Sequence, residues 1–132
     1  MKQSPEVKAV IRQVQEGVRE LTDHGIRCYP RVRVGRYELS VQASSFHYSS
    51  PRADRNKLSE YTEVEVAVLD AEGIDYRWTG WDVGGYYSWP AVARLVDRLL
   101  RDDPEYPFTD DRHSTGACFR TQAAFDAYRE GL

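Results

Sequence analysis

The sequence has few of the residues that build disulfide scaffolds, metal centres and membrane anchors. Only two of its 132 residues are cysteine, Cys28 and Cys118, and their separation of 90 positions matches neither a zinc motif nor a redox pair. No apolar run is longer than a few residues, which argues against a transmembrane helix, and the polar start lacks a secretory signal. We therefore expect a cytoplasmic protein with reduced cysteines, no cofactor and no membrane contact.

Motifs for catalysis and for phosphate binding are also missing. The chain has no Gly-x-Ser-x-Gly elbow to expose a nucleophile and no His-Glu-x-x-His zinc pattern. Gly84-Gly85 precedes a helical pattern, but without a phosphate-loop motif we interpret the pair as a tight turn. Enzymes are consequently the disfavoured class.

The net charge is small, but basic and acidic residues are unevenly distributed along the chain. The net charge is −3, yet residues 1–57 hold 11 basic and 6 acidic side chains, and residues 58–132 hold 7 and 15. General nucleic-acid binding needs a positive field, which only a short arginine-rich stretch could supply here. That stretch contains Arg27, Arg31, Arg33 and Arg36.

What is present predicts one packed domain over residues 1–132, since 41% of the residues are hydrophobic and 12% are aromatic. Apolar residues at helical spacing predict an N-terminal helix at about 5–24, capped by Ser4. The apolar stripe consists of Val7, Val10, Ile11, Val14, Val18 and Leu21. Ser88 is expected to cap a second helix at about 89–102, and Thr121 a short C-terminal helix.

Alternating apolar and polar residues predict four or five strands between the two long helices. The expected strands are 28–34, 37–46, 60–69, 74–79 and, after a bend, part of 80–87. Gly35-Arg36 has the composition of a two-residue hairpin turn, and Pro30 places the first strand at a sheet edge. The predicted fold class is α+β: a two-layer sandwich whose mostly antiparallel, four- to five-stranded sheet is packed by helices 5–24 and 89–102.

Two groups of side chains are candidates for function. His47 lies among Ser44, Ser45, Tyr48, Ser49 and Ser50; a serine–histidine catalytic pair is one hypothesis, but a polar loop at the sheet edge is favoured. Five large rings fall within twelve residues: Trp78, Trp81, Tyr86, Tyr87 and Trp89. We expect most of them in the core and at least one at a binding surface.

The segment 37–52, YELSVQASSFHYSSPR, is followed by YTEVEVA at 61–67 and by Gly85-Tyr86-Tyr87 before a helix. Over about residues 37–100 this pattern resembles small uncharacterised accessory proteins of phages and prophages. The resemblance implies a protein that acts in the cytoplasm of a host cell and inhibits host defences, either by blocking a CRISPR effector or by sequestering a nucleotide signal. The resemblance transfers no catalytic residue, but it makes five loop residues the binding candidates. The binding candidates are His47, Tyr48, Ser49, Pro51 and Arg52.

The leading hypothesis is a non-enzymatic phage or mobile-element protein that binds and inhibits a host defence protein or ribonucleoprotein, with an acidic face competing for a basic groove. One alternative is a sponge for a nucleotide, stacked by Trp78, Trp81 or Tyr86 and contacted by Arg31, Arg33 or Arg52. Others are a small nuclease or hydrolase using His47 or His113, and a toxin-immunity protein. A homo-oligomer is compatible with each of them.

Overall fold

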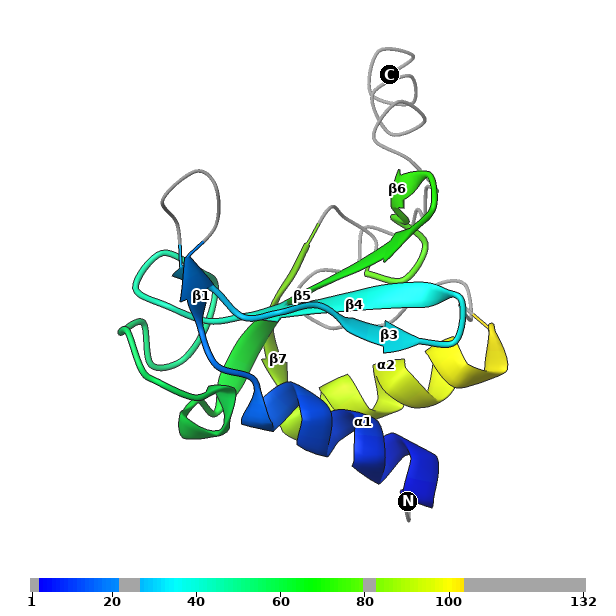
Figure 1. Ribbon diagram of the computed structural model, residues 1–132, viewed down its shortest axis with the longest axis horizontal. Helices are drawn as coiled ribbons and strands as arrows, with labels where there is room; N and C mark the ends of the chain where they lie inside the picture. The colour runs from blue at the N-terminus through cyan, green and yellow to red at the C-terminus, as the bar shows by residue number, and fades with distance from the viewer. Residues whose placement is uncertain (1–2, 22–26, 80–82, 104–132) are drawn as a thin grey trace.

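The computed structural model describes residues 3–21, 27–79 and 83–103. Along the chain, helix α1 is followed by a short strand pair, a larger sheet and helix α2 (Figure 1). The elements are α1 (Pro5–Glu16), β1 (Glu20–Leu21), β2 (Arg27–Cys28), β3 (Val32–Val34), β4 (Tyr37–Gln42), the 3₁₀ turn η1 (Leu58–Glu60), β5 (Glu63–Asp70), β6 (Gly73–Ile74), β7 (Gly84–Ser88) and α2 (Trp89–Arg101).

The main sheet has five antiparallel strands built around β5. Strand β4 pairs along one edge of β5, and β3 pairs with β4 on its far side. The second edge of β5 is shared: β7 pairs with its beginning and β6 with its end. The prediction of a four- to five-stranded antiparallel sheet is confirmed.

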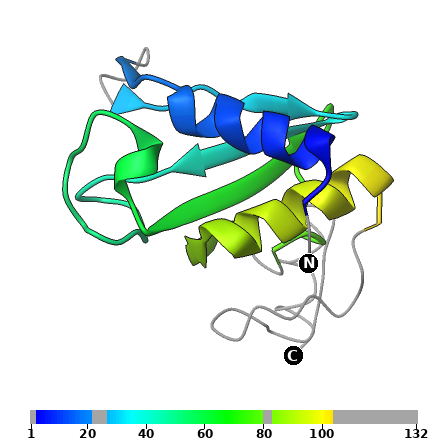
Figure 2. The ribbon, with the colours of Figure 1, turned by 90° about the horizontal axis from the view of Figure 1, so that it is seen from below.

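Both helices lie on the same side of this sheet (Figures 1 and 2). Period-two alternation directs one set of side chains from β4 and β5 toward them, and this set is buried. The buried strand residues are Tyr37, Leu39, Val41, Val64, Val66 and Val68, which pack with Val92, Leu95, Val96 and Leu99 of α2 and with Val7 and Val14 of α1. The fold is therefore the predicted α+β arrangement, with one hydrophobic core in the described residues.

The first helix is shorter than predicted. It ends at Glu16, because Gly17 adopts an extended backbone (φ −60°, ψ 142°) instead of continuing the helix. Val18 then forms an isolated bridge with Lys57 and is 62% exposed. The helical spacing of Val18 was misleading, since pairing with a distant segment determined the local structure.

Two strand predictions need similar correction. Residues 28–34 do not form one strand: Cys28 ends β2, which pairs with β1, and after Pro30 the chain enters β3 at the sheet edge. The strand predicted at 74–79 does not form beyond Ile74, where β6 ends, because Asp75 turns the chain by accepting the N–H of Arg77 (3.1 Å). The hairpin turn is as predicted, with Gly35 at φ +61° between β3 and β4.

The second helix agrees with the prediction at both ends. Ser88 caps it, its side chain accepting the N–H of Ala91, and Asp102 ends it in a left-handed conformation. The predicted C-terminal helix, Trp81, His24 and His113 lie outside the described residues, so these predictions stay open. The single domain over 1–132 likewise stays a prediction.

Candidate functional site

The segment 43–62, here called the 43–62 loop, leaves the sheet after β4 and returns to it at β5. Its first turn is built by Ser44, whose Oγ accepts the N–H groups of Phe46 (2.9 Å) and His47 (3.3 Å). The same oxygen lies 2.6 Å from His47 Nδ1. Because both lone pairs of Oγ are used, its proton is directed to Nδ1, which leaves the ring proton of His47 on Nε2.

A second serine closes the turn from inside. Ser49 is fully buried, and its Oγ donates to the carbonyl oxygen of Ser44 (3.2 Å) and accepts the N–H of Ser44 (3.4 Å). Ser49 was predicted to be a binding residue of the surface loop. Its position makes it a supporting residue instead, because it exposes no atom to a partner.

Two carboxylates brace the loop from outside. Asp54 accepts from the N–H and Oγ of Ser45 (3.1 and 3.3 Å) and from Nη2 of Arg19 (3.1 Å), which also donates to the carbonyl of Ala43. The N–H of Ser45 and the Arg19 guanidinium hold the pKa of Asp54 below its ordinary value. On the sheet side, Glu65 Oε2 accepts the N–H of Tyr48 (2.9 Å).

His47 is half-buried within this framework. Its burial lowers the pKa below the ordinary value of 6.5, while the negative charge of Glu65 acts in the opposite direction. A neutral imidazole is also the form that can accept the Ser44 proton at Nδ1. Burial therefore favours the form of His47 that the Ser44 turn can bind at Nδ1.

The loop presents aromatic side chains at its outer surface. Phe46 is 83% exposed and Tyr48 is 50% exposed. The ring of Tyr86, on β7, lies with its centroid 6.1 Å from that of Tyr48, and the guanidinium carbon of Arg52 lies 5.8 Å from the Tyr48 centroid. We call these four residues, Phe46, Tyr48, Arg52 and Tyr86, the aromatic surface.

Tyr86 is held in this place by an unusual backbone. Its φ is +58°, and the pairing of β7 with β5 shifts register between Val64 and Val66. Its N–H donates to the carbonyl of Tyr48 (2.9 Å), which ties β7 to the 43–62 loop. A left-handed conformation is a strained position for a tyrosine, and such outliers concentrate at functional sites.

The geometry does not favour catalysis by Ser44 and His47. Ser44 is only 3% exposed, and its oxygen is engaged by two backbone N–H groups and one imidazole. A nucleophile needs a free approach to the substrate as well as a base within reach. The pair is best explained as part of the turn.

The structure brings together five of the nine predicted binding residues: His47, Tyr48, Ser49, Arg52 and Tyr86, of which Ser49 is buried. Arg31 and Arg33 are exposed near the opposite edge, where β4 and β5 separate β3 from β7. Trp78 is fully buried, at 5.0 Å from the Tyr37 ring and with its Nε1 donating to Asp75. It therefore offers no stacking face to a ligand, contrary to the prediction.

Sequence reasoning missed Phe46, although it lies within the candidate segment, and it missed the supporting residues Arg19, Asp54 and Glu65. The symmetric Ser-Ser-Phe-His-Tyr-Ser-Ser pattern was an available signal, because serine side chains stabilise turns by bonding to nearby backbone groups. The supporting residues had no such signal, since their partners are distant in sequence.

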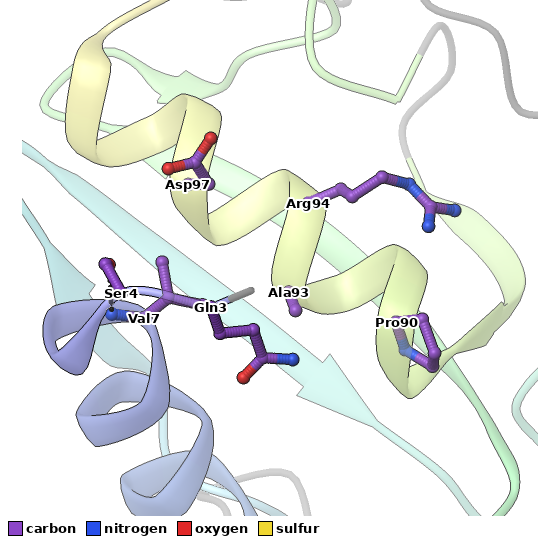
Figure 3. A pocket seen from close by; sticks show the side chains of 7 residues that line it. All are labelled: Gln3, Ser4, Val7, Pro90, Ala93, Arg94 and Asp97. Atoms are coloured by element: carbon purple, nitrogen blue, oxygen red, sulfur yellow. Dashed lines mark hydrogen bonds between the residues drawn. The ribbon is translucent and has the colours of Figure 1, made fainter. Parts of the chain in front are cut away.

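An open hollow lies between α1 and α2 (Figure 3), and none of its lining residues belongs to the aromatic surface. Figure 3 shows Val7 and Ala93 on its two sides, with Arg94 extending away from α1. Among the described residues no aromatic side chain lines it, so it does not match the aromatic–arginine pocket expected of a nucleotide sponge. Its lining residues are Gln3, Ser4, Val7, Pro90, Ala93, Arg94 and Asp97.

Within the described ranges, no three His, Cys, Asp or Glu side chains are grouped to hold a metal ion, and neither helix is long and apolar enough to cross a membrane. Comparison with protein-family models, with curated proteins and with solved structures gives no match. The resemblance to phage and prophage proteins therefore stays a prediction.

Proposed function

We propose that this chain is a non-enzymatic binding protein that recognises a protein partner through the aromatic surface. The observation that carries the proposal is the exposure of Phe46, at 83%, on a loop whose backbone is fixed from several sides. A large exposed aromatic ring gains free energy by entering a partner's pocket. A loop that is ordered beforehand loses little conformational entropy when it binds.

The composition of the loop supports the same class of function. Tyrosine and serine dominate antibody paratopes, where rigid rings supply contact area and small polar residues adapt to the partner. In this loop the serines at 44 and 49 hold the backbone, and Phe46, Tyr48 and Arg52 face outward. Aromatic residues and arginine are also the most frequent hot-spot residues of protein interfaces.

We further propose that the partner is a host defence component, which a phage or mobile-element protein would inhibit. The resemblance that motivates this part covers about residues 37–100, and Phe46, Tyr48 and Arg52 of the 43–62 loop lie inside that range. The geometry changes the expected contact, however. Several described acids of the second half are bound internally, among them Asp75 to Arg77, Asp97 to Arg101 and Asp102 to Arg36, so we assign recognition to the aromatic surface and not to an acidic face.

A panel of bacterial strains, each carrying one defence system, tests this function. Each strain expresses the chain and is challenged with a phage that its system restricts. We expect the wild-type chain to restore plaques in at least one strain, and Phe46→Ser/Tyr48→Ser to lose this effect. The control is Lys8→Ser/Arg12→Ser, which changes two exposed residues of α1.

Equal expression and equal thermal midpoints of the variants are checked first. Failure of the wild-type chain in every strain would contradict the inhibitor proposal. Plaque restoration by the Phe46/Tyr48 double variant at the wild-type level would contradict the assignment of the aromatic surface.

A further inference from the structure

The carboxylates of the 43–62 loop and of the adjoining strand are turned toward the loop's own backbone and side chains. Glu60 Oε2 accepts the N–H groups of Asn56 (3.0 Å) and Lys57 (2.9 Å). Asp54 and Glu65 accept the N–H groups of Ser45 and Tyr48, as described above. The negative charge near the aromatic surface is thus largely used to hold the loop's shape.

The cations of the same loop are used differently. Arg52, Arg55 and Lys57 are exposed, and within the described ranges none of them forms an ion pair with a carboxylate. Elsewhere, by contrast, Arg77 and Arg101 are paired with carboxylates. The loop therefore carries three cations whose charge is directed to solvent.

These cations lie beside the exposed rings. Arg52 donates to the carbonyl of Phe46 (3.4 Å) and stacks near Tyr48. Two hydrogen bonds join Ser45 to Asp54. Phe46 follows Ser45 and Arg55 follows Asp54 in the sequence, so these bonds also bring the backbone of Arg55 near that of Phe46. The backbone at Arg55 is fixed in turn, because its N–H donates to Tyr61 Oη (2.8 Å).

We infer that the partner binds the aromatic surface through an acidic segment of its chain, whose carboxylates contact Arg52, Arg55 and Lys57. This inference rests on the proposed function and specifies its partner. Arginine binds carboxylates by paired, charge-assisted hydrogen bonds, and an apolar side chain within the acidic segment would pack on Phe46. Complementary charge across an interface also accelerates association and gives specificity.

A single-stranded nucleic acid fits the same surface less well. A polyphosphate backbone favours an extended positive track, and the cations here are confined to residues 52–57. The neighbouring strands carry Glu38, Glu63 and Glu65, which alternate with the buried residues of β4 and β5 and therefore lie on the sheet face opposite the core. These carboxylates would repel phosphates that continue beyond the loop.

Selection from a yeast-displayed library of random dodecapeptides, with the full-length chain as bait, tests the inference. We expect the enriched peptides to combine two or more Asp or Glu residues with an apolar residue. Arg52→Gln/Arg55→Gln/Lys57→Gln should weaken their binding by about tenfold or more, and so should a rise from about 0.1 M to about 0.5 M salt. The matched control is Lys8→Gln/Arg12→Gln/Arg94→Gln, which removes three other exposed cations that have no ion pair in the described residues.

The outcomes separate this inference from the proposed function. Peptides without acidic residues, or unchanged binding to the loop triple variant, would overturn the inference alone, provided that Phe46→Ser/Tyr48→Ser still abolishes binding. Peptide binding that ignores Phe46 and Tyr48, or the absence of any binder to the wild-type chain, would overturn both. Tighter binding of a short oligothymidine than of every selected peptide would overturn the acidic-segment inference in favour of nucleic acid.

Discussion

Replacement of Ser44 by alanine distinguishes a structural turn from a catalytic pair. The change removes one oxygen that accepts the N–H groups of Phe46 and His47 and contacts His47 Nδ1. A hydrogen bond of this kind contributes about 0.5–1.5 kcal/mol to stability. Because water can partly replace the oxygen at these two amides, we expect the free energy of unfolding to fall by about 2 kcal/mol rather than by the full sum.

The assay is urea denaturation followed by far-UV circular dichroism, with Ser59→Ala as the matched control. Ser59 is an exposed serine of η1, so its replacement should change the free energy of unfolding by less than about 0.5 kcal/mol. The difference between the two variants isolates the contribution of the Ser44 turn. Alanine at both positions also keeps the change in side-chain volume the same.

A fall of less than about 0.5 kcal/mol for Ser44→Ala would refute the structural reasoning. So would a hydrolytic activity of the wild-type chain that disappears in Ser44→Ala while stability is unchanged. Either result would return the serine–histidine pair to the list of catalytic candidates.

Other predictions concern the core and the loop. Asp75→Ala should lower the free energy of unfolding in urea by about 3–5 kcal/mol, because it leaves buried donors unpaired. The control Asp97→Ala breaks a more exposed ion pair and should lower it by less than about 1 kcal/mol. Equal losses of stability in the two variants would contradict this prediction. The pKa of His47 is lowered from 6.5 in the folded state. The neutral histidine therefore contributes its full share to the free energy of unfolding above about pH 6.5, and this share is lost as the pH falls toward the folded-state pKa. An NMR titration that gives a pKa above 6.5 would contradict this direction of pH dependence. Gly84→Ala places a Cβ 2.5 Å from Cε1 of the buried Tyr87, so it should lower the free energy of unfolding by about 1–3 kcal/mol; a thermal midpoint equal to that of the wild type would contradict the clash.

The parts of the fold that the sequence predicts well are those with local causes. Helix α2 begins at a serine that caps it, and its apolar stripe faces the sheet. The hairpin of β3 and β4 follows from a glycine that accepts positive φ and from alternation on both sides. In each case neighbouring residues contain the whole signal.

The parts that were missed depend on contacts between distant residues. The end of α1 is determined by the pairing of Val18 with Lys57, 39 positions away, and the buried Trp78 packs edge-on against Tyr37, which lies on β4. At the candidate site, the serine turn could have been predicted from the loop sequence. The approach of Tyr86 could not, since it depends on a register shift in the pairing of β7 with β5.

At Tyr86, the residue type that would best stabilise the left-handed backbone is not the one that supplies the ring of the proposed binding surface. A non-glycine residue pays roughly 1–2 kcal/mol for that conformation, and glycine would avoid the penalty. Engineering for heat resistance commonly introduces such replacements, and activity is what they tend to sacrifice. A designer who scored this chain for stability alone would place glycine at Tyr86, and would thereby delete the ring that meets Tyr48.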